Sequence, residues 1–361
     1  MSKRIWRSFV LLQVLLSLFT CRVAAVSTSA SSAILMDAAS GRVLYEQNAD
    51  AKMLIASTTK IMTALVAIRE GEPSDVVTVS REAAYTEGSA MYLSVGEELT
   101  LETLLYGLML CSGNDAAVAI AEHIGGSTEG FVAMMNATAK ELGLSSTSFA
   151  NPNGLDAKTH YSTARDMAKL ACAAMENETF ARIVSTKSVS VCGRTMSNHN
   201  KLLSMTEGCI GLKTGYTKAA GRTLVSCAER NGQRMIAVTL QDGNDWVDHQ
   251  TLFDYGFSTY PSRSAVVRGE TVCLEEIENG TPASVPLVAS ESFSWPVKEG
   301  EALESRVELS RSLKAPLTAG EKCGEAVISL NGQEIGRVAL LCGKTVGERP
   351  MTAWNVLKIN R

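Results

Sequence analysis

The sequence predicts an α/β (α+β) protein in which helices cover an antiparallel sheet, followed by a small all-β domain. Residues 30–260 run in the order strands, helices, strands, which is not the order of a repeated strand–helix–strand unit. After Tyr260-Pro261 the helical period is lost and strand signals follow. The length of 361 residues also favours two domains, because a single hydrophobic core rarely grows that large.

A secretory signal peptide is predicted over residues 1–25. Basic residues precede the apolar segment SFVLLQVLLSLFT, and Val23 and Ala25 occupy the small-residue positions of a cleavage site. Cys21 would permit processing as a lipoprotein, but the two residues before it suit lipidation poorly. Cleavage after Ala25 would leave a mature chain that is exported, to a cell wall or a periplasm-like space.

Charge and metal-ligand patterns exclude several classes of function. Without four basic residues of the signal peptide, 30 basic side chains face 38 acidic ones, which excludes a basic face for nucleic acid. The four histidines are far apart in the sequence and no HExxH or CxxC occurs, so neither a metal nor another cofactor is expected. Of the eight remaining cysteines, Cys192 and Cys209 are the predicted disulfide pair, since they flank a hairpin segment.

The predicted elements follow one another as hairpin, helices and strands. Residues 32–50 alternate and turn at Ala39-Ser40-Gly41, which predicts a β-hairpin. Apolar residues then recur at helical spacing in five segments. These segments are 58–71, 99–110 with Thr100 as N-cap, 115–126, 128–143, and 163–175 with Ser162 as N-cap. From residue 186 the pattern changes to strands, and one last short helix is predicted over 248–257.

The segment 261–361 is predicted to be a β-domain. Its strongest signal is Asn331-Gly332 between two apolar runs, which predicts a tight hairpin. The chain ends in RPMTAWNVLKINR, where Trp354, Leu357 and Ile359 could touch a membrane surface weakly. The predicted organisation is therefore a signal peptide (1–25), a first domain (26–260) and the β-domain.

Three short polar stretches fall at the ends of these elements. Ser57 and Lys60 are i and i+3 on a helix, so the amine could reach the hydroxyl. Ser112 and Asn114 lie in the break between two apolar helices, and Lys213 lies on an apolar strand in GLKTGYT. Taken alone, these are a helix start, a turn and a protected edge strand. In the order SxxK, SxN, KTG they are the signature set of penicillin-binding proteins and serine β-lactamases.

The chain resembles the low-molecular-weight D-alanyl-D-alanine carboxypeptidases of bacterial cell walls, which are penicillin-binding proteins with a β-lactamase/transpeptidase-like domain. The resemblance rests on GSAMYLSVGEELTLETLLYGLMLCSGNDAAVAIAEHIGG, FANPNGLDAKTHYSTARDMAKLA and IGLKTGYTKAAGRTLVS, in the correct order over residues 30–260. The β-domain matches the second domain of the family in place and size. The expected partners are peptidoglycan stem peptides ending in D-Ala-D-Ala, and β-lactam antibiotics as covalent inhibitors.

Physical chemistry and the resemblance together suggest catalytic roles. Ser57 is the expected nucleophile, which is weak until a base removes its proton. Lys60 can serve as that base only if it is neutral, so its pKa must be lowered by burial and by a second cation. The resemblance places Lys213 in the cleft as that cation. Ser112 would relay a proton to the leaving amine.

Other residues of the three stretches are expected to bind the substrate. Asn114 would hold the substrate amide and Lys60, and Lys213 and Thr214 would bind the terminal carboxylate of the substrate. Gly215 would let a ligand backbone lie close. The resemblance implies an oxyanion hole formed by the backbone N–H groups of Ser57 and Tyr216, a device worth about 3 kcal/mol per donor.

The sequence departs from the family pattern in two places. Tyr216 stands where some relatives carry histidine. Where relatives often have an arginine or lysine near the cleft, this chain has Trp246, Asp248 and His249. Carboxylate recognition is therefore expected to depend more on the KTG stretch. His199 lies in a segment that lines the cleft in relatives, although a surface histidine is the expected interpretation.

Three other functions compete with the carboxypeptidase. A class A β-lactamase shares the motifs but needs a carboxylate that activates the deacylating water, and no ExxLN occurs between Asn114 and Lys213. Slow deacylation is therefore expected, so penicillin should inhibit the protein. A DD-endopeptidase would use the same chemistry on cross-links. A non-catalytic peptidoglycan-binding protein would not need the complete set of polar residues.

Overall fold

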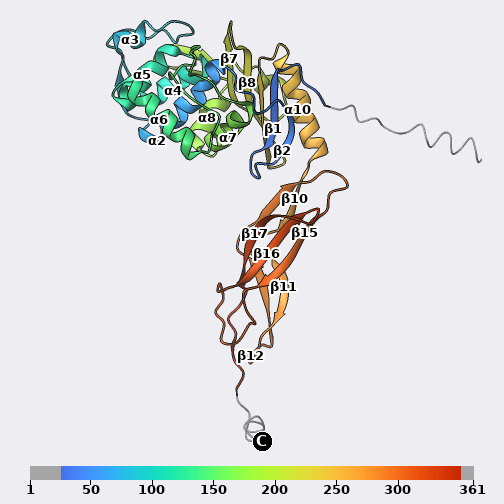
Figure 1. Cartoon of the computed structure of the whole chain (residues 1–361). Coiled ribbons are helices and arrows are strands. Elements are labelled where there is room, and N and C mark those ends of the chain that lie inside the picture. The colour runs from blue at the N-terminus through green and yellow to red at the C-terminus, as the bar shows by residue number, and fades with distance from the viewer. Residues whose placement is uncertain (1–25, 351–361) are drawn as a thin grey trace, which may run out of the picture.

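The computed structural model describes residues 26–350, so the predicted signal peptide and the tail with Trp354, Leu357 and Ile359 lie outside the described residues. The first domain is built on a five-stranded antiparallel sheet with the order β2-β1-β9-β8-β7 (Figure 1). Its strands are β1 (Ser32–Asp37), β2 (Val43–Gln47), β7 (Cys209–Thr217), β8 (Gly221–Arg230) and β9 (Gln233–Leu240). The expected antiparallel sheet is confirmed.

Helices cover both faces of this sheet, as Figure 1 shows. One face carries a helical layer, and the other carries α10 (Asp245–Thr259). Alternate residues of β1 serve the two faces: Ile34 and Met36 belong to the large core under the helical layer, and Leu35 packs in the core under α10. Because both faces are covered, every residue of β1 is buried.

The helical layer begins directly after the first hairpin. It contains η1 (Ala56–Thr59), α2 (Lys60–Glu70), α3 (Arg81–Ala84), α4 (Leu101–Leu110), α5 (Asn114–Gly125), α6 (Thr128–Glu141), α7 (Ala164–Met175), α8 (Glu178–Ser185) and α9 (Leu202–Met205). Two short ribbons accompany it, formed by β3 (Val76–Thr78) with β4 (Glu98–Thr100) and by β5 (Ser188–Val191) with β6 (Arg194–Ser197). The five helices predicted before residue 186 are present.

Helix ends follow local hydrogen bonding. Thr100 caps α4 as expected, with its hydroxyl accepting from the backbone N–H of Thr103. The prediction that Ser162 caps the next apolar helix is wrong by one residue. Thr163 is the cap of α7, because its Oγ1 accepts from the N–H of Asp166 at 3.0 Å, whereas Ser162 Oγ pairs with Thr147 Oγ1.

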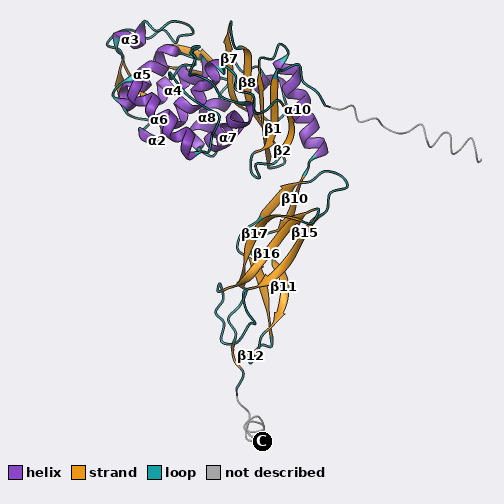
Figure 2. Ribbon diagram, viewed as in Figure 1, coloured by secondary structure: helices purple, strands orange, loops and turns teal. Residues whose placement is uncertain are grey.

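The C-terminal β-domain consists of strands in the described residues after α10 (Figure 2). Its main sheet has the order β11-β13-β17-β16-β15, and two ribbons pair β10 with β14 and β12 with β18. The strands are β10 (Ser262–Val266), β11 (Thr271–Glu276), β12 (Gly280–Thr281), β13 (Ser284–Ala289), β14 (Phe293–Pro296), β15 (Leu303–Leu309), β16 (Lys322–Leu330), β17 (Gln333–Cys342) and β18 (Gly347–Glu348). Asn331 and Gly332 form the predicted hairpin turn with φ of 52° and 80°.

The cysteines of the described residues are free thiols, so the predicted Cys192–Cys209 disulfide is wrong. Cys192 is exposed at the turn between β5 and β6. Cys209 instead begins β7 in the main sheet, where its Sγ lies 3.4 Å from the carbonyl oxygen of Gly211. The two residues therefore belong to different sheets. No helix within residues 26–350 is long and apolar enough to cross a membrane.

Candidate active site

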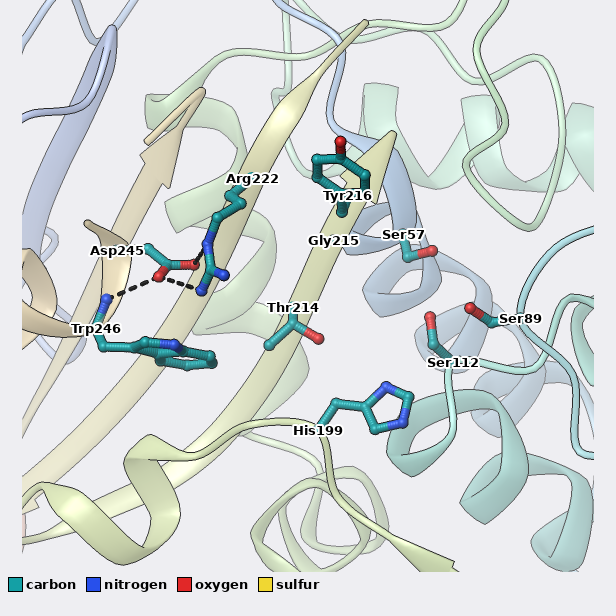
Figure 3. Close-up of a pocket in the computed structure, with 10 residues that line it drawn as sticks. All are labelled: Ser57, Ser89, Ser112, His199, Thr214, Gly215, Tyr216, Arg222, Asp245 and Trp246. Atoms are coloured by element: carbon teal, nitrogen blue, oxygen red, sulfur yellow. Dashed lines mark hydrogen bonds and ion pairs between the residues drawn. The ribbon is translucent and has the colours of Figure 1, made fainter. Parts of the chain in front are cut away.

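The three polar stretches meet in one cleft between the helical layer and the edge strand β7. The cleft has a volume of about 500 Å³. Figure 3 shows its lining residues, which are Ser57, Ser89, Ser112, His199, Thr214, Gly215, Tyr216, Arg222, Asp245 and Trp246. The hydroxyl groups of Ser57, Ser89 and Ser112 face a common space in this view.

Two glycines allow the chain around Ser57 to pack tightly. A Cβ at Gly154 would lie 2.0 Å from the carbonyl oxygen of Ala56, and one at Gly215 would lie 3.0 Å from the backbone nitrogen of Ser57. The residue before Ser57 also has a φ of 46°, a strained conformation for alanine. Gly215 therefore brings η1 against β7, and in this structure the neighbour it admits is the start of the helix.

Lys60 is fully buried directly below Ser57. Its Nζ lies 3.0 Å from Ser57 Oγ, 2.7 Å from Asn114 Oδ1 and 2.6 Å from the carbonyl oxygen of Asn153. Burial first, and then the charge of Lys213, lower the pKa of Lys60 well below its ordinary value, with Asp115 opposing them. A neutral amine can donate to the two carbonyl-type oxygens and accept the proton of the serine hydroxyl.

Ser112 and Asn114 lie where α4 ends and α5 begins. Ser112 has a φ of 61°, an unusual conformation that turns the chain between the two helices. Asn114 starts α5, and its Nδ2 donates to the carbonyl oxygen of Glu87 at 2.7 Å. That bond leaves Asn114 Oδ1 as the acceptor that faces Lys60.

The KTG stretch forms part of β7 along the other wall. Lys213 is buried, and its Nζ donates to the carbonyl oxygen of Thr214 at 2.8 Å. Burial lowers the pKa of Lys213 to about 7. Thr214 and Gly215 line the cleft beside it, and Tyr216 lines its mouth with an exposed side chain. The structure thus brings together all eight residues that the sequence singled out.

Several residues of the site were not predicted. Asn153 contributes a backbone carbonyl to Lys60, and Ser89 lines the cleft. Arg222 of β8 forms an ion pair with Asp245 at the start of α10, and its guanidinium carbon lies 5.3 Å from the ring centre of Trp246. The sequence signal for Arg222 was weak, because a lone arginine nine residues after Lys213 carries no motif.

Of the three residues that stand where relatives often have an arginine or lysine, one lines the cleft and two do not. Trp246 lines the cleft, but Asp248 and His249 are buried on the far side of the sheet. His249 lies between Ser226 and Thr239, with its Nε2 3.0 Å from Thr239 Oγ1.

His199 is exposed and lines the cleft as well. The expectation of a surface histidine is therefore right about exposure, but its ring belongs to the site. Partial desolvation in the cleft, and then the charge of Lys213, lower the pKa of His199.

In this cleft a serine hydroxyl lies beside a buried lysine, between a helical layer and the sheet edge that carries KTG. This is the arrangement of penicillin-binding serine enzymes. A family model described as D-alanyl-D-alanine carboxypeptidase, peptidase family S11, matches residues 20–244. A second model, the C-terminal domain of penicillin-binding protein 5, matches residues 260–348. The chain belongs to the S11 family of D-alanyl-D-alanine carboxypeptidases, so it is a serine-type hydrolase.

Known proteins are similar over most of the chain. D-alanyl-D-alanine carboxypeptidase DacF of Bacillus subtilis is 36% identical over 330 residues, covering 86% of this chain and 84% of the relative. D-alanyl-D-alanine carboxypeptidase DacC of Escherichia coli is 35% identical over 346 residues, covering 90% and 86%. The crystal structure of penicillin-binding protein 5 from Haemophilus influenzae matches with a TM-score of 0.75 at 31% identity, covering 90% of this chain and 100% of that chain.

These similarities confirm the carboxypeptidase prediction and favour it over the class A β-lactamase and the non-catalytic binding protein. They also confirm the fold class, because the solved neighbour spans both the helix-covered sheet and the β-domain.

Proposed function

We propose that the protein removes the terminal D-alanine from peptidoglycan stem peptides through an acyl-enzyme at Ser57. The observation that carries this proposal is the 3.0 Å contact between Ser57 Oγ and the buried Nζ of Lys60. Lys60 accepts the serine proton as Oγ attacks the carbonyl carbon of the penultimate D-alanine. The geometry supports this role because the amine also has two fixed acceptors, Asn114 Oδ1 and the carbonyl oxygen of Asn153.

Burial and a neighbouring positive charge favour the form of Lys60 that can act as a base. Burial disfavours the ammonium form of Lys60, and the neighbouring Lys213 adds a repulsive charge. Both effects therefore shift Lys60 toward its free-amine form. A free amine can accept the serine proton directly, which an ammonium group cannot.

The rest of the cleft handles the leaving group and the oxyanion. Ser112 passes the proton from Lys60 to the nitrogen of the departing D-alanine. The backbone N–H groups of Ser57 and Tyr216 stabilise the negative oxygen, each worth about 3 kcal/mol. Asn114 holds the substrate amide, and Lys213 and Thr214 bind the terminal carboxylate. Water then attacks the ester carbonyl of the acyl-enzyme and releases Ser57.

The same chemistry accounts for inhibition by penicillin. Ring opening by Ser57 leaves an ester whose leaving amine stays attached, so hydrolysis needs an activated water. In class A β-lactamases a carboxylate activates this water. We infer that the acyl-enzyme with penicillin is long-lived. The predicted signal peptide and the cell-wall substrate support an extracytoplasmic location for the mature protein.

The test is covalent labelling of the mature protein by a fluorescent penicillin, with D-alanine release from diacetyl-L-Lys-D-Ala-D-Ala measured in parallel. In the wild type we expect stable labelling and D-alanine release, and in Ser57→Ala both should vanish. Ser204→Ala, in the short helix α9 outside the cleft, is the control that should keep both activities. Rapid drug turnover without D-alanine release would contradict the carboxypeptidase mechanism.

A further inference from the structure

The β-domain buries two cysteines on neighbouring strands. Cys323 lies near the start of β16 and Cys342 ends β17, and these two strands pair inside the main sheet of that domain (Figure 1). Both side chains belong to the same apolar core, where Cys323 is 2% and Cys342 is 1% exposed. Both are free thiols in this structure. The chemistry proposed at Ser57 uses neither of them.

A β-bulge turns the side chain of Cys323 into this core. The pairing of β16 with β17 changes from Lys322 opposite Leu341 to Gly324 opposite Leu340, so Cys323 is the extra residue of the bulge. An extra residue interrupts the regular alternation of side chains between the two faces of a sheet. Cys323 therefore faces inward, while the side chain of Lys322 beside it is 53% exposed.

Cys342 reaches the same part of the core from β17. It is two residues beyond Leu340, so the two side chains share the inner face of that strand. The backbone N–H of Cys342 donates to the carbonyl oxygen of Glu321 at 2.8 Å, which places Cys342 across from the residues just before Cys323. The two thiols lie within hydrogen-bonding reach of each other. Burial, and then the neighbouring Cys342 thiol, raise the pKa of Cys323 to about 11.

A second pair of cysteines on neighbouring strands lacks this arrangement. Cys209 of β7 lies opposite Ala228 of β8, whereas Cys227 lies opposite Gly211. Adjacent residues of a strand point to opposite faces of the sheet. Accordingly, Cys227 belongs to the core under the helical layer and Ala228 to the core under α10. The register thus sets Cys209 across from Ala228 and not from Cys227.

We propose that Cys323 and Cys342 are an oxidation site that closes to a disulfide when the exported chain folds; this inference rests on the extracytoplasmic location proposed above. The co-reactant is a disulfide, carried by a small molecule or by a protein. One cysteine thiolate attacks it, forms a mixed disulfide and releases one thiol. The other cysteine thiolate attacks the protein sulfur of the mixed disulfide and releases the second thiol. The two cysteines lose two protons and two electrons, and the oxidant becomes two thiols.

The bond should form before the core of the β-domain closes. In the folded domain both thiols are almost inaccessible, and little of Cys323 is thiolate because its pKa is raised. An oxidant therefore reaches the pair in the unfolded or opening chain, and a finished bond lies out of reach of a reductant. The bond would tie β17 to β16 directly before the chain continues to β18.

The test refolds the full mature chain from urea in a mixture of reduced and oxidised glutathione. Free thiols are then alkylated, and disulfides are mapped by mass spectrometry. In the wild type we expect one bridge, between Cys323 and Cys342, and alkylation of the six other cysteines. Cys342→Ala should lose the bridge without forming another, whereas the control Cys209→Ala should keep it. The bridge should be reduced by a phosphine at least about tenfold more slowly in native buffer than in urea.

Alkylation of all eight cysteines after refolding, glutathione adducts in place of the bridge, or bridges between other cysteines would overturn the proposal. Equal rates of reduction in native buffer and in urea would overturn the position of the bond in the closed core. D-alanine release is measured on the same samples. Its absence in the wild type would overturn the proposed function and leave the disulfide map unaffected, so the two failures are distinguishable.

Discussion

The two domains treat charge in opposite ways. In the described residues every buried polar or charged side chain lies between Ser32 and His249, and the β-domain buries none. The core of the β-domain is apolar apart from cysteine, and the ion pairs of that domain are at the surface, such as those of Arg337. Burial of a charge costs stability unless the group is paired or neutralised. The first domain therefore carries a stability cost at its cleft, where altered protonation is useful for catalysis.

Several buried groups of the first domain, near Ser57, have defined hydrogen-bond partners. Lys60 Nζ lies within 3.0 Å of three oxygens, those of the Ser57 hydroxyl, the Asn114 side chain and the Asn153 carbonyl. Asp115 accepts from the backbone N–H groups of Met91, Leu93 and Ala116. His160 accepts from the N–H of Ala150 at Nδ1, so Nε2 carries the proton that bonds to Thr59 Oγ1. Each of these groups is therefore held in place by defined partners.

The largest effect is expected from the buried lysine of the first domain. Lys60→Met removes the base and leaves Ser57 without a proton acceptor, so D-alanine release should fall by about 10³-fold or more. Lys322→Met changes a half-exposed lysine of the β-domain and should leave activity unchanged. The measurement is kcat/KM for both variants. If Lys60→Met kept more than a tenth of the activity, the claim that Lys60, unlike Lys322, is the catalytic base would be contradicted.

Acid should destabilise the first domain and spare the β-domain. Burial lowers the pKa of His160 to about 4 and that of His249 to about 3, from an unfolded value of 6.5. Because the folded pKa is the lower one, the unfolded chain binds protons first, and stability is lost as pH falls below 6.5. The loss is at most about 3 kcal/mol per histidine near pH 4.

The β-domain has no histidine, since all four precede residue 250. Calorimetry from pH 7 to pH 4 should therefore show a first-domain transition that falls in temperature faster than the β-domain transition. Equal shifts of both transitions would contradict the assignment of the acid sensitivity to His160 and His249.

The β-domain should respond to packing changes only. Leu340 is fully buried in its core, so Leu340→Ala should destabilise that domain by about 2–5 kcal/mol. The cleft is formed by the first domain, so the initial rate of D-alanine release at 25 °C should be unchanged. Thermal unfolding and activity, measured on the same sample, check both statements. A large fall in kcat would show that the β-domain shapes the cleft.

The sequence predicted those parts of the site that depend on local geometry. Ser57 and Lys60 are neighbours because i and i+3 meet on a helix, and Asn331-Gly332 forms a turn because both residues tolerate positive φ. The Arg222–Asp245 pair was missed because it joins residues 23 positions apart on a strand and a helix whose packing the sequence does not display. The contact of Lys60 with Asn153 was missed because it uses a backbone oxygen, which no residue type signals.

The pH dependence of kcat/KM for D-alanine release tests the central claim most directly, because the active form requires Lys60 neutral and Lys213 charged. With the pKa of Lys60 well below its ordinary value and that of Lys213 about 7, we expect a bell-shaped profile that falls on the acid side with Lys60 and on the basic side with Lys213. An activity that keeps rising to about pH 10, where an ordinary lysine loses its proton, would contradict the claim that the cleft lowers the pKa of Lys60.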